Sequence, residues 1–338
     1  MHGLQDELMT IVRAVAFPSP NLVTLAGFAS PHAAAGTTLA LTPAVHPLIA
    51  QLQTLFYEQC YCRRFDGMPV PRPATPSAND DLAAALSAAN ASRDRWDAGW
   101  QLKQTLPNGQ IVAVKGAMTR MAWPGEFHGH GPPGVQARPG TAISMFMPRE
   151  SLVSQPGFYF AFGEAPADQQ EDYGVVRFYW NVTAKGAPLL VGAITAALNR
   201  FGIPFRFKCL RQQALFDRCD VAVLYVAKRH CRIVATLLPE VHRAVQQELK
   251  PATPLFSKHL ADGLGFAEDP RTGESFGMNR CRLMAEAVCR AHQRGHDSAE
   301  ARLGEIAAAF AAAGLSFERP YLNAGTIDAY DFGGRLAA

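Results

Sequence analysis

The stretches VVRFYWN (residues 175–181) and FRFKCL (residues 205–210) establish the fold class, because their β-branched and aromatic residues are typical of β-strands. Side chains alternate between the two faces of a strand, so each stretch places its polar side chains on one face. These side chains are Arg177, Tyr179 and Asn181 in the first strand and Arg206 and Lys208 in the second.

Further strands are predicted on both sides of these two. They cover residues 110–115, 141–147, 157–162, 221–227 and 233–237. A helix over residues 192–201 lies among them and ends at Gly202. Strands separated by turns, with one intervening helix, indicate an α+β fold with a mainly antiparallel sheet.

Both ends of the chain are predicted to be helical. Apolar residues recur at helical spacing over about the first 65 residues, and residues 81–100 form an alanine-rich helix. The proline-rich residues 67–80 read as a linker. Further helices are predicted over residues 240–250, 282–293 and 297–313, the last with Asp297 as its N-cap. We therefore expect a helical N-terminal lobe over residues 1–100 and an α+β core with C-terminal helices over residues 101–338.

Composition excludes several classes of protein. The 338 residues are 48% hydrophobic and 18% charged, which supports a large core and excludes wholesale disorder. A net charge of +3 is too small to indicate nucleic-acid binding. No apolar run reaches the ~20 residues of a membrane span and no secretion signal is visible, so we expect a cytoplasmic protein without membrane contacts. Seven cysteines without a C-x-x-C pair predict reduced core thiols, and we expect no metal site and no cofactor.

Positive charge is concentrated between Arg200 and Arg232, a segment that contains eight arginines and lysines and only two aspartates. Together with the strand at 175–181, this segment brings four cations toward one sheet face: Arg177, Arg206, Lys208 and Arg218. Such cations repel one another unless an anion bridges them, and arginine binds phosphate through two parallel hydrogen bonds. The group predicts a site for a small anionic ligand; the alternative is a solvated sheet face.

Three other segments contain candidate residues, each with a plainer alternative. Lys115 ends a strand and is either a site lysine or a surface charge. His128 lies in the loop FHGHGPPG and is either a general acid or an exposed loop histidine. The loop at 263–282 contains Glu274 and Arg280, and it either lines a pocket or caps the helix that follows.

Six motifs, in this order along the chain, resemble the HopA family. They are LFYEQCYC (55–62), PGFYFAFGEA (156–165), VRFYWNV (176–182), IPFRFKCL (203–210), FDRCDVAVLY (216–225) and GFAEDPRTGESFGMNRCR (265–282). The resemblance covers about residues 50–295. Members of this family include a type III effector of a plant pathogen and the lyase components of thioamitide and class V lanthipeptide pathways.

The resemblance implies a dehydration that depends on a partner. A separate phosphotransferase-like kinase phosphorylates Ser or Thr of a precursor peptide, and the HopA-like protein then eliminates phosphate to give dehydroalanine or dehydrobutyrine, without a cofactor. The family is similar to phosphothreonine lyases, which use a lysine base, a histidine acid and an arginine-rich pocket. The alternative is a type III effector-like protein that binds host phosphoproteins or acts on them.

Roles for the candidate residues follow from this chemistry. Lys208 is the expected base, with Lys115 second, because neighbouring cations lower the pKa of a lysine from its ordinary ~10.4. The expected phosphate contacts are Arg177, Arg206, Arg218 and Lys115. Tyr179 is expected to donate a hydrogen bond to the enolate or phosphate, and His128 to act as the acid. The expected substrate-binding residues are Asn181, Glu274 and Arg280.

Overall fold

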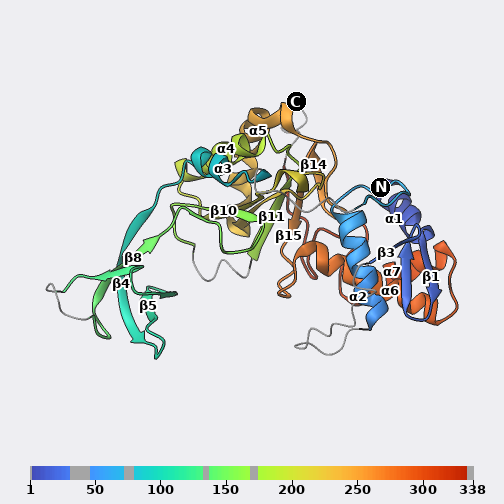
Figure 1. The fold of residues 1–338 in the computed structure, drawn as a ribbon, viewed down its shortest axis with the longest axis horizontal. Coiled ribbons are helices and arrows are strands. Elements are labelled where there is room, and N and C mark those ends of the chain that lie inside the picture. Colours follow the sequence, from blue (N-terminus) through green and yellow to red (C-terminus); the bar gives the residue numbers. More distant parts are fainter. Residues whose placement is uncertain (1, 31–45, 72–79, 132–136, 168–173, 333–338) are drawn as a thin grey trace.

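The computed structural model describes residues 2–30, 46–71, 80–131, 137–167 and 174–332. The fold is α+β, as expected, and every strand pair in these ranges is antiparallel. Along the longest axis of the molecule, a five-stranded sheet lies at one end, a seven-stranded sheet in the middle and a three-stranded sheet at the other end, with helices beside the last two (Figure 1). Residues 72–79, most of the predicted linker, lie outside the described ranges.

The central sheet has seven strands in the order β14-β15-β11-β13-β12-β10-β9. Their bounds are β9 (Glu150–Ser151), β10 (Phe158–Phe162), β11 (Val175–Trp180), β12 (Phe205–Leu210), β13 (Ala222–Ala227), β14 (Lys258–Ala261) and β15 (Leu264–Glu268). The strands predicted at 157–162, 175–182, 205–210 and 221–227 are confirmed to within two residues. Helix α4 (Ala187–Arg200) packs on this sheet and against α5 (Cys231–Val245) (Figure 1).

The strand predicted at 233–237 is wrong, because these residues belong to α5. The helix buries Val234, Leu238, Val241 and Val245, a helical spacing that is visible only over a window longer than one strand. Pro239 lies inside the helix rather than before it, so residues 240–245 of the helix predicted at 240–250 are the end of α5, and Gln246–Glu248 form a 3-10 turn.

A smaller five-stranded sheet projects from one end of the molecule, at the opposite end from α1, α2, α6 and α7 (Figure 1). Its strands are β4 (Arg95–Thr105), β5 (Ile111–Lys115), β6 (Met118–Ala122), β7 (Phe127–Gly129) and β8 (Ala142–Met147). It has its own apolar cluster around Trp100. The helix predicted at 81–100 is therefore only partly correct: α3 (Ala83–Ala89) ends at Asn90, and β4 begins soon after because Trp100 packs in this cluster.

The N-terminal part contains α1 (His2–Arg13), then strands β1 (Val15–Ser19), β2 (Leu22–Leu25) and β3 (Phe28–Ala29), and then α2 (Pro47–Phe56), which continues as a π-helical turn over Tyr57–Tyr61. The expectation of a purely helical start is wrong, because residues 15–29 form a three-stranded sheet that buries Val23 and Leu25.

The two ends of the chain pack together. Helix α1 lies against α7 (Ala299–Ala312), and α2 lies against α6 (Phe276–Gln293). The Arg302 guanidinium donates hydrogen bonds to the carbonyl oxygens of Val12 (2.9 Å) and Val15 (2.8 Å). Ser298, not Asp297, is the N-cap of α7, because its hydroxyl accepts from the Ala301 amide while Asp297 pairs with Arg302.

All seven cysteines are buried and unpaired, as predicted for core thiols. In the described ranges, no helix is long and apolar enough to cross a bilayer.

Candidate functional site

The central strand β13 places the predicted cations side by side. It pairs with both β11 and β12, so that Arg177, Tyr225 and Arg206 form one row across the sheet. Two residues further along, Tyr179, Val223 and Lys208 form the next row on the same face. We call this surface, together with Arg218 beside it, the cationic face (Arg177, Arg206, Lys208 and Arg218).

Tyr225 lies between two guanidinium groups. The Arg177 guanidinium carbon is 5.2 Å from the centre of the tyrosine ring, and that of Arg206 is 4.6 Å away. Arg177 is buried and donates through Nε to the Asp269 carboxylate at 2.8 Å. Arg206 is exposed and makes no hydrogen bond or ion pair within the described part of the chain. Arg206 is therefore the arginine of this row that has bonding capacity left for a ligand.

Lys208 has an environment that favours the neutral amine. Its Nζ lies 4.2 Å from the centre of the Phe158 ring and donates one 3.3 Å hydrogen bond to Gln155 Oε1. Burial, and then the charges of Arg177, Arg218 and Arg206, lower the pKa of Lys208 from 10.5 to about 8, although Asp220 acts in the opposite direction. About one tenth of Lys208 is thus an unprotonated base at pH 7, far more than of an ordinary lysine.

Arg218 is held beside the sheet by a carboxylate. Its Nε and Nη2 atoms donate to the two oxygens of Asp220, both at 2.8 Å, and Nη2 also donates to the Tyr57 hydroxyl at 3.1 Å. Asp220 is 8% exposed. Burial favours its protonated form, but Arg218 and Lys208 outweigh this and hold the pKa of the carboxyl below its ordinary value. Asp220 stays ionised, so it offsets Arg218 and leaves Arg206 and Lys208 to meet an incoming anion.

Aromatic side chains close one side of the cationic face. The Tyr61 ring meets Tyr179 edge-on with a centroid separation of 6.3 Å, and Phe276 at the start of α6 lies 6.2 Å from Tyr179. The Tyr179 hydroxyl is buried, and burial raises its pKa to about 12, while the neighbouring Arg177 and Tyr61 act in the opposite direction. A Cβ atom on Gly277 would lie 2.4 Å from the Tyr61 ring, so the glycine allows this close approach.

Two predicted site residues lie in the smaller sheet and not on the cationic face. Lys115 Nζ bonds Asp97 Oδ2 at 2.9 Å and the Ala98 carbonyl oxygen at 2.7 Å. His128 is exposed on β7, an edge strand, with its ring centroid 4.8 Å from that of Trp96. Lys115 therefore has a carboxylate partner of its own in this structure. His128 and Lys208 lie in different sheets.

Asn181 and Glu274 make contacts that stabilise loops. The Asn181 side-chain amide is buried and donates to the Ala252 carbonyl oxygen at 2.9 Å. Glu274 accepts hydrogen bonds from the Arg282 guanidinium at 3.0 Å, next to Ser275, which is the N-cap of α6. Of the two alternatives for the loop at 263–282, the contacts of Glu274 match the helix-capping one, whereas Asn181 lies outside that loop.

Arg280 holds the C-terminal segment. It is 1% exposed, and its Nε and Nη2 atoms donate to the carbonyl oxygens of Pro320 and Leu322, both at 2.9 Å. Burial lowers its pKa from 12.5 to about 10. The expectation that Arg280 binds substrate has no support here, because no part of its guanidinium is open to a ligand.

Sequence reasoning missed several residues of the site. Tyr225 could have been predicted, because side chains alternate along the strand at 221–227 and Tyr225 lies on the same face as Val223, the neighbour of Lys208. The contacts of Asp269 and Gln155 come from loops, and no local pattern indicates which side chains those loops approach. The π-helical turn that presents Tyr57 has no signal in the sequence, although such turns recur at functional sites.

A cleft of about 510 Å³ lies beside the cationic face, between the central seven-stranded sheet and the smaller five-stranded sheet. We call it the inter-sheet cleft; it is lined by Arg95, Arg120 and Met147 of the smaller sheet and by Phe162, Arg206 and Tyr225 of the central sheet, among others. Arg206 and Tyr225 thus belong both to the cationic face and to the wall of this cleft.

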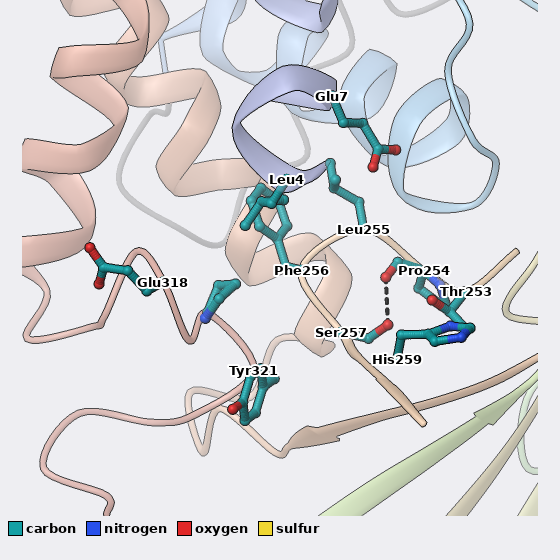
Figure 2. Close-up of a pocket in the computed structure, with 11 residues that line it drawn as sticks. Leu4, Glu7, Thr253, Pro254, Leu255, Phe256, Ser257, His259, Glu318 and Tyr321 are labelled. Atoms are coloured by element: carbon teal, nitrogen blue, oxygen red, sulfur yellow. Dashed lines mark hydrogen bonds between the residues drawn. The ribbon is translucent and has the colours of Figure 1, made fainter. Parts of the chain in front are cut away.

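A second cavity, of about 300 Å³, lies between α1 and the loop at 253–257 (Figure 2). Leu4 and Glu7 of α1 line it, and burial raises the pKa of Glu7. No arginine or lysine is among its described lining residues, so it is unsuited to an anionic ligand. No group of three or more metal-binding side chains occurs among the residues whose positions are described.

The chain belongs to the HopA1 effector protein family, whose model matches residues 147–322, just over half of its length. The whole cationic face falls within this match, while Tyr57, Lys115 and His128 fall outside it. The match starts about a hundred residues later than the predicted resemblance and extends beyond its end.

Two solved structures are similar to this one. The effector protein from Pseudomonas syringae pv. tomato strain DC3000 is 14% identical, with a TM-score of 0.46 over 84% of this chain and 92% of that chain. The effector protein from Pseudomonas syringae pv. syringae strain 61 is 13% identical, with a TM-score of 0.43 over 80% of this chain and 88% of that chain. No curated protein matches the sequence.

Proposed function

We propose that this protein eliminates phosphate from phosphoserine or phosphothreonine in a peptide, leaving dehydroalanine or dehydrobutyrine. The observation that carries the proposal is the pair formed by Lys208 and Arg206 on one sheet face. Lys208 is a lysine whose pKa is lowered to about 8, and Arg206 is an exposed guanidinium with no carboxylate partner in the described ranges. The first supplies a base and the second a contact for the leaving group.

The reaction balances with these groups alone. The neutral amine of Lys208 takes the α-proton of the phosphorylated residue, and the C–H electron pair forms the Cα–Cβ double bond. The Cβ–O bond breaks, and its electron pair leaves with phosphate. The proton then passes from the Lys208 ammonium to phosphate, which departs as HPO₄²⁻ and restores the free amine. No separate histidine acid is required, which agrees with the position of His128 away from this face.

The other residues of the site stabilise the negative charge of the phosphate and of the enolate. Arg206 binds the phosphate directly, and Arg177 and Arg218 add positive potential although each already holds a carboxylate. The Tyr179 hydroxyl is buried beside Tyr61 and Arg177, so a small opening of its surroundings would let it donate to the enolate oxygen. A hydrogen bond to a charged acceptor is stronger than one to a neutral acceptor, so this contact would strengthen as charge develops.

We propose a precursor peptide of ribosomal peptide maturation as the substrate, phosphorylated by a separate phosphotransferase-like kinase. The family description favours a second candidate, an effector-like protein whose cationic face binds phosphoproteins without chemistry. Both candidates use the same anion site, and they differ in whether phosphate is released.

Incubation of the purified protein with a phosphoserine peptide and a thiol, without kinase, metal or nucleotide, tests the proposal. Mass spectrometry should show loss of phosphoric acid and a thiol adduct of dehydroalanine. Lys208→Met should abolish both, while Lys103→Met, an exposed lysine of the smaller sheet, should change neither. Phosphate release with uptake of water would mean a phosphatase. Tight binding without release, also with the genomically adjacent kinase and precursor, would favour the effector-like candidate.

A further inference from the structure

The inter-sheet cleft brings two arginines that the elimination step does not use next to Arg206, which it does use. Three arginines line it: Arg95 of β4, Arg120 of β6 and Arg206 of β12. Because two of these strands belong to the smaller sheet and one to the central sheet, three guanidinium groups that are distant in sequence share one cavity.

Two of these arginines have no carboxylate partner within the described part of the chain. Arg95 pairs with Asp97 at 3.0 Å, and Asp97 is also bonded to Lys115. Arg120 donates to the Met147 sulfur at 3.0 Å, a weak acceptor, and the Asp97 carboxylate offsets part of its charge without an ion pair in the described ranges. Arg206 lies over the Tyr225 ring and has no ion pair within those ranges. The cleft therefore has bonding capacity for at least one anion besides the phosphate of the proposed reaction.

Lys208 is a neighbour of the cleft, because Arg206, on the same face of β12, lines it. Ser151 and Ser154 line it, and Gln155, the next residue, accepts a hydrogen bond from Lys208 Nζ. Its remaining walls are mostly apolar, including Phe162 and Phe205. A volume of about 510 Å³ lies in the range of small-ligand sites, so the cleft has room for a short peptide segment.

We propose that the inter-sheet cleft binds a second anionic group of the substrate peptide, on a residue that flanks the phosphorylated one. This rests on the proposed function, because it assumes that a phosphorylated residue occupies the cationic face. A glutamate or aspartate carboxylate and a second phosphate share the chemistry that Arg120 offers, and arginine recognises both. The substrate class is then an acidic or multiply phosphorylated peptide.

Direct binding tests this without turnover. The wild-type protein is titrated into fluorescent peptides whose phosphoserine is replaced by a phosphonate isostere that cannot lose phosphate. The flanking residues are glutamine in one peptide, glutamate in the second and a second phosphonate isostere of phosphoserine in the third. We expect the glutamate peptide to bind roughly tenfold more tightly than the glutamine peptide at low salt. The third peptide shows which anion the cleft prefers.

Two variants locate the effect. Arg120→Gln should remove the preference for acidic flanks but leave the affinity for the glutamine peptide unchanged, which also shows that the variant is folded. Lys103→Gln, an exposed cation of the same sheet that does not line the cleft, should keep the preference.

Equal affinity of the three phosphonate peptides for the wild-type protein would overturn the cleft proposal and leave the phosphate site intact. A preference that survives in Arg120→Gln would also overturn it. If acidic peptides bind equally well with and without the phosphonate, and this binding needs Arg120, the cleft proposal holds for an anionic peptide and the proposed lyase function fails.

Discussion

The rate of phosphate elimination should depend on pH through Lys208. With a pKa of about 8, Lys208 is roughly one-tenth neutral at pH 7, against about one part in three thousand for a lysine at 10.5. Between pH 8 and pH 6 its neutral fraction falls from about one half to about one hundredth. Because the base must be unprotonated, kcat/KM should fall about fiftyfold over this interval and level off above pH 8.

The assay is phosphate release from a phosphoserine peptide at substrate concentrations far below KM, from pH 6 to pH 9. The midpoint in kcat should lie at higher pH than the midpoint in kcat/KM, because bound phosphate raises the pKa of Lys208. Lys103→Met, on an exposed strand position, should reproduce the wild-type profile. A kcat/KM that is flat from pH 6 to pH 8, or elimination at an undiminished rate in Lys208→Met, would refute the reasoning.

The same lowered pKa predicts a change in stability. The pKa of Lys208 is lower in the folded state than in the unfolded state, so burial of its ammonium lowers the free energy of unfolding. Below pH 8 this cost is complete and amounts to at most about 3 kcal/mol. This cost disappears as pH rises from about 8 to 10.5, where the folded state has released the proton and the unfolded state has not. Lys208→Met should therefore raise Tm at pH 7 and have a smaller effect at pH 10, as measured by calorimetry.

Three other substitutions, one of them with a matched control, separate function from stability. Arg206→Gln should raise KM roughly ten- to a hundredfold, since one charge-assisted contact to phosphate is lost, and should leave Tm unchanged because the side chain is exposed and unpaired within the described ranges. Arg280→Gln should lower stability by about 3 kcal/mol or more in urea unfolding, because two buried carbonyl oxygens lose their donor. Gly277→Ala should cost about 1–3 kcal/mol through its clash with Tyr61, whereas Gly304→Ala, a helical glycine with open space, should gain up to about 1 kcal/mol; equal effects of the two alanines would contradict the packing described.

The central sheet was predictable from sequence because its strands alternate. Apolar and polar side chains alternate along residues 175–181 and 205–210, although in the first strand both faces are buried. Prediction failed where the chain's period is ambiguous. The run at 233–237 is rich in β-branched residues, yet its neighbours bury every third or fourth residue. Residues 15–29 contain many apolar residues, but Pro18, Pro20 and Gly27 interrupt them into runs too short for a clear period, and their strands are stabilised by packing on helices distant in sequence.

Only the parts of the site that lie within a single strand could be predicted from the sequence. Alternation placed Arg206 next to Lys208, and the sheet then added Arg177 through its register with β13. Which arginines are neutralised depends on Asp220 and Asp269, and their approach is set by loop geometry that sequence spacing does not encode. Lys115 illustrates the opposite error, because a lysine at a strand end looks the same in sequence whether it faces a ligand or an aspartate.

The packing of the two chain ends has a consequence for synthesis of the protein. Arg302 bonds Val12 and Val15 across 290 and 287 residues. A ribosome adds about 5–20 residues per second, so the apolar side of α1, with Leu8 and Ile11, waits roughly 15–60 s for α7 to emerge. During that time this helix is a natural binding site for a chaperone, and the yield of folded protein should depend on how well it is shielded.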